Sequence, residues 1–155
     1  MSIKDLPYST AFRLEAIPPY DFTLTVHKPA GWSLLTSFET FEEGTLWTAM
    51  RLSAGKLFGL KLKSEGTVER PKVFCELFSR ERLRAEERKE LSRIVAQTLS
   101  LQEDVREFYA LAEHDSIVKS LVEDLYGMRR TKQPDIFPSL VLAVTLQMAP
   151  IRRSH

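Results

Sequence analysis

The spacing of the apolar residues changes near Ser79, and this change limits the chain to a fold with one sheet-forming half and one helical half. Between Phe22 and Leu77, apolar and polar residues alternate in short runs that turn residues interrupt, which is typical of antiparallel strands. From about Ser79 onward, apolar residues recur at intervals of three and four among many charged residues, which is typical of helices. The sequence therefore predicts an α+β fold, with an antiparallel sheet domain at 1–78 and a helical domain at 79–155.

The expected strands follow from the alternation and from the turn residues between the runs. The segment 53–56 is predicted to close a hairpin between two of these strands. The segment 32–41 fits neither period well, so both a helix and a further strand remain open there. The predicted strands cover 22–26, 46–52, 57–63 and 68–77.

The second half is predicted to contain four helices, the first over 80–99 and the second around 105–112. Asp115 is expected to cap the third, and Gly127 to end it. The inner face of this third helix is expected to carry Ile117, Val118, Leu121, Val122 and Leu125. The last helix, capped by Asp135 and running toward Pro150, is apolar on almost every face and needs several neighbours to bury it.

Composition excludes several classes of protein. The chain has 22 Lys and Arg against 21 Asp and Glu, so its net charge of +1 does not indicate nucleic-acid binding. Its single cysteine, Cys75, cannot form an internal disulfide, and its three histidines do not have metal-ligand spacing. Neither a secretory signal nor a long apolar run occurs, which predicts a cytoplasmic protein without a membrane partner. We expect neither a metal ion nor another cofactor.

The candidate binding residues are mostly basic. Arg129 and Arg130 stand beside a polar linker, and Arg152 and Arg153 follow an expected helix end, so all four are candidates for phosphate contact. The run of charges over 80–90 alternates in sign and is interpreted as an exposed, ion-paired helix, and the neighbouring carboxylates elsewhere as solvated surface.

Other residues could form a site of a different kind. Cys75 is interpreted as a core residue, because a free cysteine is usually buried and inert. His27 and Trp32 flank a turn where a small-molecule pocket is conceivable, although packing is the favoured reading of both residues.

Two segments, in the right order and at the right separation, resemble a family of DNA repair enzymes. The segment 18–22, PPYDF, is similar to the opening of the N-terminal sheet domain of bacterial-type alkylpurine (3-methyladenine) DNA glycosylases and their 8-oxoguanine-excising relatives. The segment 135–148 begins with DIFP and ends with LQM, and it resembles the family's aspartate-x-phenylalanine helix that ends in a glutamine. The likeness extends over about 8–154 and places the chain near the helix-hairpin-helix DNA glycosylase superfamily.

This resemblance implies a sheet domain similar to one repeat of the TATA-binding protein, followed by the first helices of an all-helical glycosylase domain. In the family, the residue after the glutamine enters the duplex where the damaged nucleotide is flipped out. Gln147 and Met148 occupy these positions, and an apolar side chain such as that of Met148 can replace lost stacking.

The same resemblance implies that catalysis lies elsewhere. Family catalysis needs a hairpin with two glycines around an aliphatic residue, followed by an aspartate that stabilises the cationic sugar. The last glycine here is Gly127, and Asp135 is interpreted as a helix cap, so no catalytic residue is assigned. Ala149-Pro150 also departs from the small or polar residue usual before the next helix.

The chain is therefore predicted to be the front, non-catalytic part of a glycosylase acting on alkylated or oxidised purines in double-stranded DNA. We expect its gene to continue past His155. The alternative is a complete non-enzymatic α+β module that binds protein or nucleic acid and associates, also with itself, through the apolar last helix. A small-molecule binder with a pocket near His27 and Trp32 is the third possibility.

Overall fold

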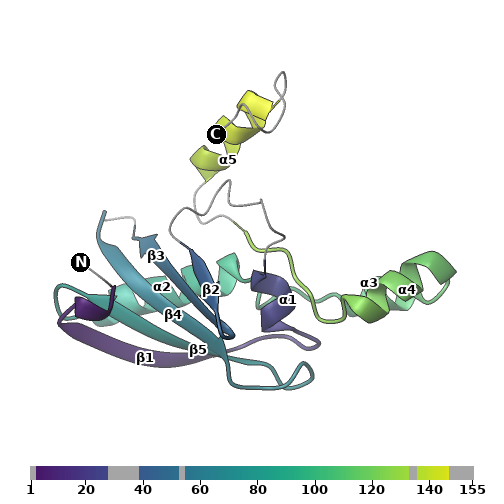
Figure 1. The fold of residues 1–155 in the computed structure, drawn as a ribbon, viewed down its shortest axis with the longest axis horizontal. Helices are drawn as coiled ribbons and strands as arrows, with labels where there is room; N and C mark the ends of the chain where they lie inside the picture. Colours follow the sequence, from purple (N-terminus) through teal and green to yellow (C-terminus); the bar gives the residue numbers. More distant parts are fainter. Residues whose placement is uncertain (1–2, 28–38, 53–54, 133–135, 147–155) are drawn as a thin grey trace.

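The structure, a computed structural model, describes residues 3–27, 39–52, 55–132 and 136–146 (Figure 1). These residues form a five-stranded antiparallel sheet and several helices, which confirms the predicted α+β class. The strands are β1 Tyr8–Glu15, β2 Thr40–Glu42, β3 Thr45–Arg51, β4 Leu57–Ser64 and β5 Lys72–Ser79, and they lie in the order β1-β5-β4-β3-β2. The helices are the short 3-10 turn η1 Ile3–Asp5, then α1 Phe22–Val26, α2 Ala85–Thr98, α3 Arg106–Ala112, α4 Ser116–Asp124 and α5 Ile136–Leu146.

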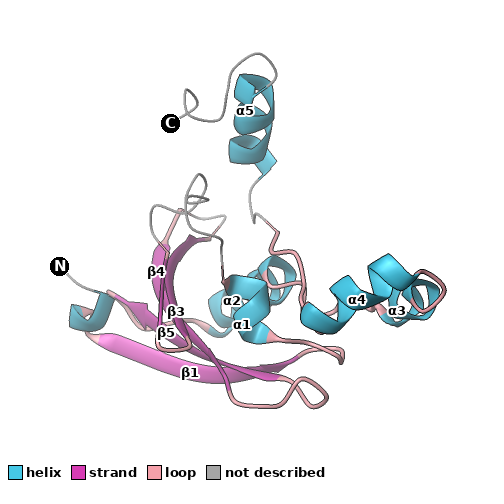
Figure 2. Ribbon diagram, turned by 45° about the vertical axis from the view of Figure 1, so that its right-hand side comes forward, coloured by secondary structure: helices cyan, strands magenta, loops and turns pink. Residues whose placement is uncertain are grey.

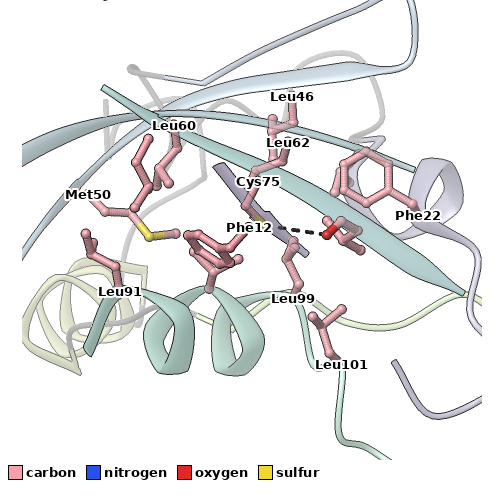
Figure 3. Packing of buried hydrophobic residues seen from close by; sticks show 14 of the residues in the cluster. Phe12, Phe22, Leu46, Met50, Leu60, Leu62, Cys75, Leu91, Leu99 and Leu101 are labelled. Atoms are coloured by element: carbon pink, nitrogen blue, oxygen red, sulfur yellow. Dashed lines mark hydrogen bonds between the residues drawn. The ribbon is translucent and has the colours of Figure 1, made fainter. Parts of the chain in front are cut away.

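Only one face of the sheet is covered by α1 and α2, and the hydrophobic core lies between them and the strands (Figure 2). Alternate strand residues point inward, as the period of two requires, and meet apolar residues of α2 and of the turn after it. Figure 3 shows Leu91, Leu99 and Leu101 facing strand side chains such as Phe12 and Cys75. Apolar residues of α2 belong to the same hydrophobic core as the strands, so this core extends across the domain boundary expected at 78/79. The division of the chain into two domains at that boundary stays a prediction.

The hairpin expected around 53–56 is confirmed, since β3 and β4 pair antiparallel with Arg51 opposite Leu57. The helices expected after Ser79 are also present. The first of them begins at Ala85 rather than at Arg80, because the Arg84 N–H donates to the Glu87 carboxylate at 2.8 Å and starts the helix there. The prediction of an exposed, ion-paired helix was therefore wrong for residues 80–84.

The segment 22–26 was predicted as a strand and is the helix α1. The carboxylate of Asp21 accepts a hydrogen bond from the Leu24 N–H at 2.8 Å, which caps a helix. The buried residues are Phe22, Thr25 and Val26, whose spacing is that of a helix face. Five residues are too few to distinguish a period of two from one of 3.6 when positions 22 and 26 suit both.

Two further strands differ from expectation. β1, at Tyr8–Glu15, was not predicted, yet it pairs along its whole length with β5. The strand expected from residue 68 begins at Lys72, after a turn closed by the bridge between Thr67 and Arg70. Of the undecided segment 32–41, residues 40–41 belong to β2 and 32–38 lie outside the described residues.

Cys75 is fully buried in β5, as expected for a core residue. Burial raises the pKa of its thiol from the ordinary 9.0 to about 12, and burial also raises the pKa of Tyr20. Above pH 9.0 the unfolded chain therefore loses protons that the folded chain retains.

We expect the free energy of unfolding to be insensitive to these groups below pH 9.0 and to fall as pH rises from there toward 12. Urea denaturation at a series of alkaline pH values measures this decline. The Cys75→Ala variant should show a shallower decline than the unmodified chain. Equal slopes for the two proteins would contradict the contribution assigned to the thiol.

Candidate functional site

The segment 18–22 lies at the joint between the sheet and the helical half. The Tyr20 N–H donates to Val68 O at 2.9 Å, and the Asp21 N–H donates to Gly127 O at 2.8 Å. Gly127 has φ +85, a conformation that glycine adopts without strain, and it follows the end of α4 as expected. The segment thus connects the sheet's core to the end of the α3–α4 pair.

Arg129 is the most constrained polar residue of this joint. Only 4% of it is exposed, and its guanidinium donates to Pro19 O at 2.7 Å, Met128 O at 3.1 Å and Glu103 O at 3.4 Å. Its backbone N–H donates to Thr25 Oγ1 at 3.0 Å. Arg129 was expected to be a candidate phosphate contact, and in the structure its guanidinium donates to backbone carbonyl groups of the chain instead.

Tyr20 is buried beside this network and is 2% exposed. Thr25 Oγ1, the nearby hydroxyl, donates to Asp21 O at 2.6 Å and accepts from the Arg129 N–H. Within the described residues, the Tyr20 hydroxyl has no hydrogen-bond partner.

An apolar groove of about 370 Å³ opens between α3, α4 and the chain that follows them. The two helices project from one end of the sheet (Figure 1). Arg129 and Glu103 border the groove, and its walls are otherwise mainly apolar. The apolar lining consists of Val105, Phe108, Tyr109, Val118, Leu121, Val122, Leu125 and Met128.

The face of α4 that was expected to point inward is largely open. Ile117 is 74% exposed, Leu121 56% and Leu125 41%, and α4 has no buried residue. The helical spacing was correct, but the expected burial was wrong, because the described elements leave this side of α4 uncovered. Val118 and Val122 are half-buried, and they line the groove together with Leu121 and Leu125.

α5 confirms the expected apolar last helix. The described side chains of Phe137, Leu140, Val141 and Val144 are each about half exposed or more. The expected cap Asp135, and the expected continuation toward Pro150, lie outside the described residues. Within the described part, α5 carries no charged residue.

The other expected site residues divide into two groups. Arg130 is exposed at the rim of the groove, and its carbonyl accepts a hydrogen bond from Ser100 Oγ at 2.8 Å. His27 lies with its ring 6.1 Å from that of Phe41. Outside the described residues lie Gln147, Met148, Arg152, Arg153 and Trp32.

Another recess, of about 390 Å³, is lined by residues of α3, α4 and the turn after α4, and it was not anticipated. The rings of Tyr109 and Tyr126 lie 5.2 Å apart there, beside Glu113 and Glu123. The Tyr126 hydroxyl donates to Glu69 Oε1 at 2.9 Å, and this hydrogen bond raises the pKa of Tyr126. No local sequence pattern links Tyr109 to Tyr126, which are brought together by the turn of the chain between α3 and α4.

Asp115 caps α4 as the sequence predicts. Its carboxylate accepts from the N–H groups of Ile117 at 2.9 Å and Val118 at 3.1 Å. We expect Asp115→Ala to lower the free energy of unfolding by about 1 kcal/mol. Thermal denaturation followed by circular dichroism measures the loss. Asp124→Ala, at the C-terminal end of the same helix, is the control and should not destabilise the chain.

Comparison with protein-family models, with curated proteins and with solved structures found no match to this chain. Among the described residues, no group of His, Cys, Asp and Glu could hold a metal ion. No helix in the described ranges is long and apolar enough to cross a membrane.

Proposed function

We propose that the chain is the front, non-catalytic part of a helix-hairpin-helix DNA glycosylase that acts on alkylated or oxidised purines. The observation that carries the proposal is the joint at 18–22, because the glycosylase-like segment helps to fasten the helical half to the sheet. In this proposal the sheet half and α2 form a rigid support for the helices.

The proposed DNA contacts combine a wedge with phosphate-binding cations. Met148 enters the duplex beside Gln147, and Arg130, Arg152 and Arg153 bind phosphates. These roles rest on the resemblance and on the positions of the residues in the sequence. Arg129 is left out, since its guanidinium donates to three backbone carbonyl groups.

The chain by itself is proposed not to excise bases. Its sequence contains no glycine-aliphatic-glycine triplet, and the only acidic residue after Asp124 is Asp135. The positive charge that develops on the sugar as the base leaves therefore has no assigned carboxylate to stabilise it. Incubation with duplexes that contain 3-methyladenine or 8-oxoguanine should release no free base, and measurable release would contradict the proposal.

Binding to damaged duplex tests the wedge directly. Met148→Ala should weaken binding to a duplex with one damaged purine more than binding to an undamaged duplex, measured by fluorescence anisotropy. Met128→Ala is the matched control, because Met128 is an exposed methionine at the groove. Arg130→Ala should reduce the slope of log K against log salt by about 0.9 if Arg130 neutralises one phosphate. Equal effects of Met148→Ala and Met128→Ala would argue against a wedge.

A second candidate function is favoured by one observation, the uncovered apolar surface of α4 and α5. Large exposed apolar patches usually mark association sites, so a non-enzymatic module that associates through α5 is the alternative proposal. Sedimentation equilibrium tests whether the chain associates with itself. A dimer that Leu140→Glu and Val144→Glu convert to a monomer would favour association, whereas a monomer at all concentrations would exclude self-association.

A further inference from the structure

The outer face of the sheet, opposite α2, carries aromatic rings and cations in successive rows. Directly paired residues on antiparallel strands point to the same face. One row contains Arg13, Phe74 and Lys63, as the pairings Arg13↔Phe74 and Lys63↔Phe74 show. The next row contains Lys61 and Trp47, and the third contains Phe78. Each row therefore holds one aromatic ring.

The rings and cations of these rows are in contact. The Arg13 guanidinium lies 5.3 Å from the Phe74 ring centroid and the Lys63 ammonium 5.2 Å from it. The Lys61 ammonium lies 5.5 Å from the Trp47 ring. The ring centroids of Trp47 and Phe78, which belong to neighbouring rows, are 6.1 Å apart. Rows follow one another at about 7 Å, since a strand rises about 3.3 Å per residue and the same face recurs every second residue.

The face is open but not uniformly so. The three rings are half-buried, and the side chain of Arg13 is 59% exposed. η1 covers part of the third row, where Ile3 lies against Gly59. The accessible surface is thus centred on Phe74 and Trp47.

Charges on this face are unequally compensated. Arg13 is paired with Glu65 at 2.6 Å, and Lys61 with Glu76 at 3.4 Å. Within the described residues, Lys63 has no carboxylate at ion-pair distance and is held only over the Phe74 ring. A ring flanked by cations is arranged to meet a ligand that offers both a planar apolar group and a negative charge.

We infer that this face, defined as Arg13, Trp47, Lys61, Lys63, Phe74 and Phe78, binds single-stranded nucleic acid. Unpaired bases stack on the rings, and phosphates meet Lys63 and the partly neutralised Arg13 and Lys61. A duplex keeps its base faces stacked inside and so cannot use the rings in this way. An acidic peptide matches the cations but leaves the rings without a planar partner. The inference does not depend on the proposed glycosylase function, because it concerns a surface away from the helical half.

Fluorescence titration tests the inference on the full 155-residue chain. The probe is oligothymidylate of about 12 nucleotides, within the usual site size of one binding domain. In a Trp32→Phe background, Trp47 is the only tryptophan, and its emission should be quenched on binding at low ionic strength. Fluorescein anisotropy of the same oligonucleotide gives the affinity independently.

Two variants divide the effect into stacking and charge. Phe74→Leu keeps an apolar side chain but removes the ring, and it should weaken binding between about 5-fold and 100-fold. Lys63→Gln should lower the slope of log K against log salt by about 0.7, the value for one phosphate on a single strand. Lys89→Gln, an exposed cation on α2 across the sheet, is the control and should leave affinity unchanged.

Several outcomes would overturn the inference. The simplest is that the unmodified chain shows neither quenching nor a change in anisotropy. This outcome does not depend on the folding of any variant. Equal losses with Lys89→Gln and Lys63→Gln would indicate general attraction of charge. Equal affinity for a duplex, unaffected by Phe74→Leu, would indicate phosphate contact alone. Displacement by polyglutamate at equal charge concentration would indicate an acidic-peptide surface instead.

Discussion

Replacing Arg129 with alanine is expected to lower the free energy of unfolding by about 3 kcal/mol or more. The guanidinium donates to three backbone carbonyl groups from a side chain that is only 4% exposed, and hydrogen bonds from a charged group contribute about 1.5–3 kcal/mol each. Alanine would leave Pro19 O without its donor and open a cavity between the sheet and the helical half. Urea denaturation followed by circular dichroism measures the loss.

The neighbouring residue provides a matched control. Arg130 is exposed, so Arg130→Ala should change the stability by less than about 0.5 kcal/mol. Arg129→Lys keeps the charge but cannot reproduce the planar arrangement of donors, so it should recover only part of the loss. A similar small effect for Arg129→Ala and Arg130→Ala would show that the buried network does not stabilise the chain.

Gly127→Ala is expected to have the second large effect. At φ +85, an alanine costs about 1–2 kcal/mol in the left-handed conformation alone. A Cβ would also lie 2.7 Å from Asp21 N and 3.1 Å from Tyr20 C, which are backbone atoms that cannot rotate away. We therefore expect the hydrogen bond from the Asp21 N–H to Gly127 O to be weakened as well. The free energy of unfolding should then fall by more than the cost of the strained conformation alone.

Gly55 separates the two contributions. Its φ is +82, close to that of Gly127, but a Cβ there would have no atom within 4 Å. Gly55→Ala should therefore report only the conformational cost, about 1–2 kcal/mol. If chemical denaturation gives the same loss for both variants, the close approach of Gly127 to the 18–22 segment has no energetic consequence.

The sequence predicted the fold better than it predicted the environment of the candidate site residues. Arg130 is exposed, while Arg129, its neighbour with the same side chain, is buried. Nothing in the adjacent sequence distinguishes them, because the acceptor that Arg129 reaches at 2.7 Å, Pro19 O, is 110 positions away. The rows of rings and cations on the outer face could not be predicted for the same reason, because strand pairing brings together residues that are distant in the sequence.

Local patterns in the sequence determined the class of the fold, the β3–β4 hairpin, the helical second half and the cap at Asp115. Such features depend on hydrogen bonds and periodicities within a few residues, so neighbouring residues suffice to predict them. Tertiary structure alone decided that Arg129 is buried and that the inner face expected for α4 is exposed. Burial depends on which distant segments pack together, as where the Arg129 guanidinium donates to Pro19 O.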